Sequence, residues 1–320
     1  MSLVRVAVLV ARRSAAAALV LAILSALIFT VTEVLPGDAV GAVAGADATV
    51  SEREQLRREL GLDAPAARRY VDWAAAAVRG DLGTGYVGRR EVTEVLVDRL
   101  PNSLLLTSLA MALAVPLAVA VGLVAGMRAG RRADRLVSTA TLVAVGIPEF
   151  LVAALLVAVF AAGLGLLPEV SLVPIGGRPW DEPRILVLPV AALSVAAIAA
   201  AARLLRASVA DIAAAPYVEA ARLRGVTGLR LAVRHVLPNA VGPAVQVTAV
   251  MFAGLVGGAV VVETLFNYPG IGYELQQAVA NRDVPMVQGL ALATCAIALA
   301  VLLLGDVAHL VLSPALRGRS

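Results

Sequence analysis

The chain has 320 residues, and all 27 of its basic side chains are arginines, set against 23 acidic side chains for a formal charge of +4. Apolar residues make up 60% of the sequence and charged residues 16%, whereas soluble domains have about 45–50% and roughly 25%. This balance excludes an ordinary soluble domain and indicates a membrane protein. The absence of lysine excludes P-loop nucleotide hydrolases and Schiff-base enzymes, which need a lysine amine. One cysteine, Cys295, and two histidines offer neither an internal disulfide nor a Cys/His zinc site.

Six apolar stretches are long enough to cross a bilayer, because about 18–27 helical residues span a hydrocarbon core of ~30 Å. They are Ser14 to Thr32, Ser103 to Met127, Leu136 to Ala162, Ile185 to Ala202, Ala240 to Val262, and Val284 to Leu304. The first is longer than the 7–15 residues of a typical signal-peptide core, so we expect it to be retained. Cleavage near Ala42-Val43-Ala44 is the alternative. The predicted fold is all-α: a polytopic membrane protein with six transmembrane helices.

The arginines predict the orientation, because short cytoplasmic loops retain them. With the N-terminus inside, the cytoplasmic segments carry fifteen arginines and the two short outer loops carry three, Arg178, Arg184 and Arg282. Both termini are therefore expected in the cytoplasm. The expected location of the protein is the plasma or inner membrane. The basic charge sets topology in this interpretation, and it does not indicate a nucleic-acid partner.

The long segment between the first two spans is polar and patterned, and we expect it to be an outer helical region. Its predicted helices run from a capping box at Ser51–Glu54 to Leu60, from Pro65 to Gly80, and from Glu91 to a break at Pro101. A cover over loops and a substrate-binding role both remain open for it. The predicted regions are 1–35 with the first span, the outer segment 36–102, the permeation domain 103–312 with a cytoplasmic loop at about 203–238, and the tail 313–320.

That loop has the pattern of a helix, a glycine break and a second helix. Pro216 suits a helix start, Gly225 suits a left-handed helix end, and Thr227 can cap the next helix. The short helix between Pro216 and Gly225 carries one carboxylate, two alanines and two arginines. Docking into a cleft of a soluble partner and an ordinary solvated loop are both consistent with this composition.

The same loop resembles the EAA signature of the membrane permeases of ABC importers, through Glu219-Ala220-Ala221, Gly225 and Leu237-Pro238. Further matches narrow the resemblance to the oligopeptide, dipeptide and nickel importer permeases. They are Leu35-Pro36-Gly37-Asp38, Leu60-Gly61-Leu62-Asp63 with Pro65, Tyr70 and Trp73, Gly80-Asp81-Leu82-Gly83, Arg99-Leu100-Pro101, Ile147-Pro148 with Phe150, Leu188-Pro189, Arg203 with Arg206 and Ser208, Arg234-His235 with Asn239-Ala240, Gly257-Gly258-Ala259-Val260, Glu263, Phe266, Pro269-Gly270 with Gly272, and Arg282-Asp283 with Pro285 and Gly289. The sequence departs from the family pattern at three places. His235, Ala39 and Ser313-Pro314 stand where the family often has isoleucine, proline and Asp-Pro, respectively.

The resemblance implies a non-enzymatic subunit with three kinds of partner protein besides lipid. These are a second related permease, two ABC ATPase subunits, and an extracytoplasmic solute-binding protein that delivers the solute. The chain would hold no cofactor, and ATP would be used by the ATPases. The implied ATPase-coupling residues are Tyr217, Glu219, Ala220, Ala221, Arg222, Arg224, Gly225 and Pro238. Peptides are the expected solutes, with nickel chelates, glutathione or other small solutes as alternatives.

Four polar residues in the predicted spans are candidates for the translocation path: Glu149, Gln246, Thr248 and Glu263. A carboxylate at membrane depth is costly and suggests a function. Glu149 follows Pro148, which can open its helix, and could meet the amino terminus of a peptide; pairing with a neighbouring helix is the alternative. Gln246 and Thr248 suit pore lining, permease pairing or simple packing equally. Glu263 precedes Pro269-Gly270-Ile271-Gly272, a turn expected in the external gate.

Two other classes of membrane protein fit the sequence less well. A secondary transporter or channel working alone would favour several ionisable residues at mid-bilayer and an internal repeat, whereas one such residue and no convincing repeat are visible. An intramembrane enzyme would need a nucleophile and a base at the same depth. His235 is expected in the cytoplasm and His309 at the end of a span, so the sequence shows no such pair.

Overall fold

The computed structural model describes residues 3–34, 49–174, 176–240 and 244–312, with side chains except at 3–7, 244–249 and 308–312. Within these ranges the chain is helical, and the single strand-type pairing is an isolated bridge between Thr84 and Glu91. The helices are α1 (Leu3–Val34), α3 (Val50–Glu59), α4 (Ala66–Val78), α5 (Val92–Met127), α6 (Arg132–Gly146), α7 (Glu149–Leu156), the π-helix η1 (Val157–Gly163), the 3-10 helix η2 (Pro179–Asp181), α8 (Arg184–Ala213), α9 (Pro216–Leu223), α10 (Gly228–Leu231), the π-helix η3 (Ala232–Val236), α11 (Leu237–Ala240), α12 (Ala244–Leu265), α13 (Ile271–Ala280) and α14 (Val284–Leu312).

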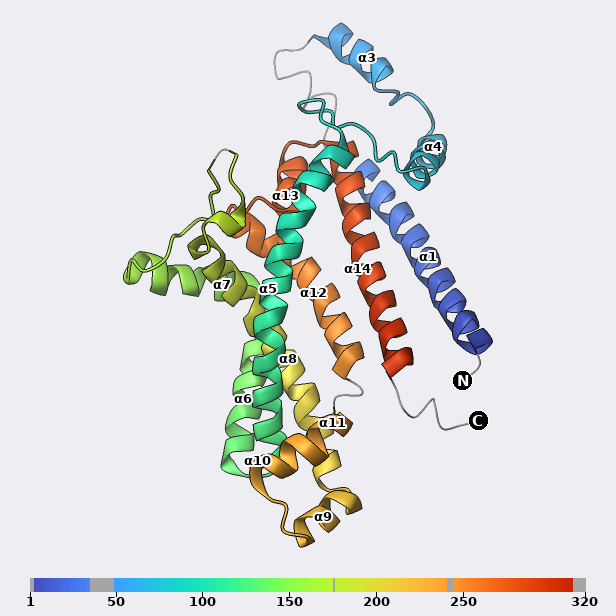
Figure 1. Ribbon diagram of the computed structural model, residues 1–320. Helices are drawn as coiled ribbons and strands as arrows, with labels where there is room; N and C mark the ends of the chain where they lie inside the picture. The colour runs from blue at the N-terminus through green and yellow to red at the C-terminus, as the bar shows by residue number, and fades with distance from the viewer. Residues whose placement is uncertain (1–2, 35–48, 175, 241–243, 313–320) are drawn as a thin grey trace.

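Helices α5 and α8 form the centre of the bundle. α6, α7 and α12 pack against α8, α14 packs against α12, and α1 packs against α14 at one side (Figure 1). α3 and α4 lie at one end of the bundle, and α9, α10 and α11 lie at the other (Figure 1). The outer segment and the loop with the EAA-like residues are therefore on opposite sides of the apolar region, as the predicted topology requires.

Two glycines let α5 and α8 approach closely. A Cβ at Gly122 would lie 2.9 Å from the backbone oxygen of Ala202, and one at Gly126 would lie 2.6 Å from the side chain of Val209 and 2.8 Å from the backbone oxygen of Arg206. The spacing of four residues places both glycines on one helix face, which is the small-xxx-small pattern of membrane helix pairs.

The prediction of six spans is confirmed only in part. Four helices in the described part of the chain are long and apolar enough to cross a membrane: Val8–Val34, Val92–Met127, Arg184–Ala213 and Val284–Val307. α12 has 22 residues, but its described apolar part is Val250–Leu265, which is shorter than a full span.

The expected span from Leu136 to Ala162 is not one straight helix. α6 ends at Gly146, and α7 with η1 continues at an angle of 100°. The cause is Pro148, which disfavours helical geometry in the residue before it, so Ile147 is extended with φ −88° and ψ 122°. Counted together, the bent helices make a fifth span.

From residue 49 onward the outer segment contains the predicted helices, but two boundaries differ. The cap of α3 is Thr49 with Glu52, two residues before the predicted Ser51 and Glu54. The Thr49 side chain accepts the backbone N–H of Glu52, and the Glu52 side chain accepts the backbone N–H of Thr49. The predicted third helix does not end at Pro101, because α5 runs unbroken through Pro101 and Pro116. A proline in a helix that packs against neighbours removes one backbone donor without ending the helix.

Helix α4 is fixed to the outer end of α1 by aromatic side chains. Phe29 of α1 lies 5.4 Å from Tyr70 and 6.1 Å from Trp73 between ring centroids. The hydroxyl of Tyr70 also hydrogen-bonds Ser25 over 3.0 Å, and Arg69 pairs with Glu33. At the other end of α1, Arg13 forms an ion pair with Asp306 of α14. These contacts hold the peripheral α1 to α4 and α14.

We expect Gly126→Ala to destabilise the protein by about 1–3 kcal/mol, because the new methyl group overpacks the contact with Val209. The thermal unfolding midpoint in detergent measures this loss. Gly146→Ala is the matched control, since a Cβ at Gly146 meets no atom within 4 Å. Equal midpoints for the two variants would contradict the close-packing account.

Candidate functional site

The EAA-like residues form α9, a short helix attached to the end of α8. Pro216 is at the first turn, as predicted, and Val218 and Ala221 are buried against a cluster that includes Leu205 and Val209 of α8. The side chain of Ala221 therefore fastens α9 to its own bundle and is not presented to the surface. Ala220 is half-buried beside it.

The opposite face of α9 is exposed and charged. The side chains of Tyr217, Glu219, Arg222, Leu223 and Arg224 are all exposed, with 84% of Leu223 accessible. The exposed part of α9 thus carries charged side chains together with the apolar side chain of Leu223. In Figure 1 this helix lies next to α10, at the end of the molecule opposite α3 and α4.

Gly225 ends α9 in the predicted way. Its φ is +82°, Val226 donates its N–H to the Ala221 carbonyl over 3.1 Å, and Gly225 donates to Arg222 over 2.9 Å. These two bonds are those of a Schellman motif, which needs a left-handed residue here. Thr227 precedes α10 as predicted, but its side chain makes no capping hydrogen bond. The π-helix η3 and α11, which contains the exposed Pro238, then lead towards α12.

An ion pair between the half-buried Arg206 and the buried Asp134 fixes α6 to α8 near α9. Nε and Nη2 of Arg206 donate to the two carboxylate oxygens of Asp134 over 2.8 and 2.6 Å. Asp134 is 3% exposed, and its carboxylate also accepts the backbone N–H of Gly130 and the hydroxyl of Ser138. The paired, fully hydrogen-bonded carboxylate is the arrangement that makes a buried charge tolerable. Arg206 is part of a family motif in the sequence, whereas Asp134 belongs to none and its role follows only from the structure.

Glu149 lies at the first position of α7, beside a cavity of about 570 Å³. The other lining residues are Ala196, Ala197, Ala200, Ala201 and Leu204 of α8 and Val250, Met251, Gly254 and Leu255 of α12. Glu149 is the single ionisable residue among them. Its carboxylate also occupies the space beside Gly258, where a Cβ would collide with it.

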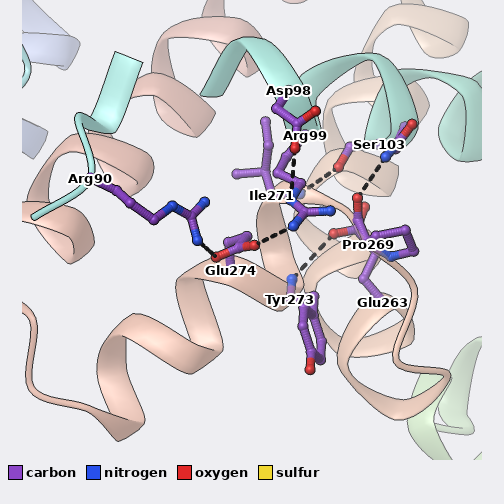
Figure 2. A network of polar contacts seen from close by, with 10 residues as sticks. Arg90, Asp98, Arg99, Ser103, Glu263, Pro269, Ile271, Tyr273 and Glu274 are labelled. Carbon is purple, nitrogen blue, oxygen red and sulfur yellow. Dashed lines mark hydrogen bonds and ion pairs between the residues drawn. The ribbon is translucent and has the colours of Figure 1, made fainter. Parts of the chain in front are cut away.

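Glu263 lies elsewhere, at the outer end of α12, and is fully buried. Its Oε2 accepts the backbone N–H group of Gly272 over 2.7 Å. It also accepts the N–H group of Tyr273 over 3.4 Å (Figure 2). The N-cap residue of α13 is Gly270, which has no side chain that could accept these N–H groups. Glu263 therefore caps α13 from another helix. Gly270 and Gly272 also leave the space that this carboxylate fills.

Further bonds join α13 and its preceding turn to α5. Asn102 donates to the Pro269 carbonyl over 2.8 Å, Ile271 donates its N–H to Ser103 over 2.8 Å, and Arg99 pairs with Glu274 over 2.9 Å (Figure 2). We call this set of contacts, with Glu263, the outer network. The outer network fixes the turn that is expected in the external gate. Glu263 contributes through its hydrogen bonds to Gly272 and Tyr273, and it does not line the cavity beside Glu149.

A third buried carboxylate anchors the outer loop before α5. Asp283 is 3% exposed and accepts the backbone N–H groups of Tyr86 and Val87 over 2.9 and 3.0 Å. Burial raises the pKa of the nearby Tyr86 hydroxyl above its ordinary value. Asp283 is part of the Arg282-Asp283 motif, but its partners are almost 200 residues away, beyond the reach of any local pattern.

The remaining path candidates, Gln246 and Thr248, lie in the first turns of α12, where side chains are outside the described residues. The departures Ala39 and Ser313-Pro314, and the tail from residue 313, also lie outside them. In the described part of the chain no three histidine, cysteine or acidic side chains gather as metal ligands.

Two family models match the chain over most of its length. Residues 118–318 match the binding-protein-dependent transport system inner membrane component, and residues 6–107 match the N-terminal region of such membrane components. The chain belongs to this family. It is thus a multi-pass permease subunit of an ABC importer, and it is not an enzyme. The resemblance inferred from the EAA-like loop is confirmed.

Among curated relatives, the chain is 34% identical to the glutathione transport system permease protein GsiC of Escherichia coli K12 over 295 residues. That alignment covers 92% of this chain and 94% of the relative. The same protein from Escherichia coli O6:H1 strain CFT073 and from Shigella flexneri serotype 5b has the same identity and coverage.

We expect Asp134→Asn and Arg206→Gln each to lower the thermal unfolding midpoint. The midpoint of the double variant should fall by less than the sum of the two single decreases, because either single change already breaks the ion pair. Thermal unfolding in detergent measures all three. Asp98→Asn, which changes an exposed carboxylate, is the control. Additive losses would show that the two side chains do not stabilise the protein through each other.

We also expect Glu263→Ala to speed hydrogen exchange at the amides of Gly272 and Tyr273, since both lose their acceptor. Hydrogen exchange read by mass spectrometry on the peptide that contains α13 tests this. Glu274→Gln is the control on α13 itself. It removes the ion pair with Arg99 of α5 and should leave these two amides protected. Unchanged exchange in Glu263→Ala would contradict the capping role.

Proposed function

We propose that this permease, together with a second homologous permease, forms the translocation path of an importer for short peptides. Two kinds of support favour this class of solute. The motifs resemble those of oligopeptide, dipeptide and nickel importer permeases, and glutathione, named in the relatives, is itself a peptide derivative. Glutathione transport is the second candidate because of the 34% identity with those relatives. A nickel chelate is the third.

The observation that carries the coupling proposal is the exposed face of α9. Glu219, Arg222 and Arg224 form a charged surface around the exposed side chains of Tyr217 and Leu223. We place this face in the cleft of an ABC ATPase subunit, with Glu219 and the two arginines as ionic contacts. Ala221 and Ala220 hold the helix at its base, Gly225 ends it, and Pro238 begins the return towards α12.

The proposed complex contains two permeases, two ATPases and a solute-binding protein on the outer side. ATP would be bound and hydrolysed by the ATPases alone. With α9 in the cytoplasm, both termini lie inside, which agrees with the arginine distribution. ATP-driven closure of the ATPases would then push α9 and shift the bundle between inward-facing and outward-facing states.

For the translocation path we propose Glu149 with Gln246 and Thr248, on α7 and α12. The support is the cavity that Glu149 shares with α8 and α12. We assign Glu263 to the outer network, where it holds the turn before α13 in place at the external gate. The whole outer segment 36–102 would lie on the same side as the binding protein.

We expect Glu219→Arg to reduce co-purification of the ATPase subunits by about tenfold or more, because it reverses a charge on the contact face. The permease itself should fold normally, since the side chain is exposed. Glu182→Arg makes the same charge change on an exposed carboxylate between η2 and α8 and should keep the ATPases bound. Normal co-purification of Glu219→Arg would contradict the role of α9.

The rival function is a stand-alone transporter. ATP-independent uptake by the purified chain in liposomes would support this rival, whereas a stable complex with separate ATPases supports the importer.

A further inference from the structure

The cavity beside Glu149 has the size of a small-molecule site and an unusual wall. Its volume of about 570 Å³ falls in the range of roughly 300–1,000 Å³ typical of ligand pockets. Apart from Glu149, every residue that lines it is apolar, and most are alanine or glycine. Small side chains leave the volume open and impose little shape, so such a wall accepts solutes whose side chains differ.

Glu149 is the single charged group on this wall. Its side chain is half-buried, and within the described residues it forms neither an ion pair nor a hydrogen bond with another side chain. A carboxylate in apolar surroundings is costly unless a cation or hydrogen-bond donor meets it. The first turn of α7 favours negative charge at this position.

The position of the carboxylate is fixed by the backbone around it. Pro148 breaks the helix directly before Glu149, which orients α7 across the bundle at 100° to α6. On the other side, Gly258 of α12 lacks the Cβ that would collide with the carboxylate. A helix break and a glycine on two different elements thus place one anion at the edge of an otherwise apolar cavity.

We infer that this cavity binds the protonated amino group of the transported solute, with Glu149 as its counter-ion and the alanine-rich wall of α8 around the rest of the solute. A single carboxylate suits an ammonium group with three N–H donors better than a metal ion, which needs several ligands. The contact would be the same for every solute with a free amino terminus. This inference rests on the proposed transport of peptides.

The test compares two solutes in liposomes that contain the complete importer. One is a tripeptide with a free amino terminus, and the other is its N-acetylated form, both chosen after calorimetry shows that they load the binding protein. Initial uptake rates are measured at saturating loaded binding protein for the wild type, Glu149→Gln and Glu149→Asp. Glu169→Gln, which changes an exposed carboxylate after η1, is the control.

We expect Glu149→Gln to slow uptake of the free-amine peptide about tenfold or more, because a charge-assisted contact is lost, and to leave the acetylated peptide unchanged. Glu149→Asp should retain part of the free-amine rate. Equal slowing of both peptides would overturn the inference and point to a contact with the partner permease. Unchanged uptake of both would overturn it as well. Failure of the wild type to import either peptide would instead contradict the proposed peptide transport on which the inference rests.

Discussion

The close contact between α5 and α8 is the constraint on which the other features depend. Gly122 and Gly126 let the two backbones meet, which fixes α8 at the centre of the bundle. One end of α8 then carries α9, while its middle supplies the alanine wall of the cavity beside Glu149. In a bilayer, where lipid is as apolar as leucine, such close packing contributes more to helix association than apolar burial does.

A continuous set of contacts connects α9 to the cavity. α9 packs on Val209, and one turn earlier on α8 Arg206 binds Asp134 of α6. α6 then ends at the break before Pro148, where Glu149 begins α7. In the proposed mechanism, a push on α9 would therefore move α8 and α6 as one body and change the position of Glu149. On the outer side, Glu263 and the outer network hold α12, α13 and α5 together separately.

Local features of the fold were predictable because their causes are local. Pro216 and Gly225 start and end α9 where the sequence indicated, and Gly61 and Gly80 end the outer helices in the same way, with left-handed φ angles. The cap of α3 was misplaced because Thr49–Glu52 and Ser51–Glu54 both match the capping pattern, and only the folded chain selects one. The break at Pro148 was noted as possible, but its 100° bend depends on packing against α8 and α12.

The contacts that shape the candidate sites were mostly beyond sequence reasoning. Asp283 with Tyr86, Asp134 with Arg206, and Glu263 with Gly272 join residues on different elements, and no spacing rule relates them. The contact between α5 and α8 is an exception. Gly122 and Gly126 form a small-xxx-small pair inside an apolar helix, and this sequence pattern predicts a helix contact. The motifs indicated the family and a candidate coupling loop, whereas the contacts of each carboxylate required the structure.

The central claim is that this chain is a passive path driven through α9 by separate ATPases. The most direct measurement is uptake of a labelled peptide into liposomes that contain the two permeases, the ATPases and the binding protein, with ATP or a non-hydrolysable analogue inside. The account predicts uptake with ATP, none with the analogue, and none when the ATPases are omitted. Uptake by the permease alone, without ATP, would contradict it.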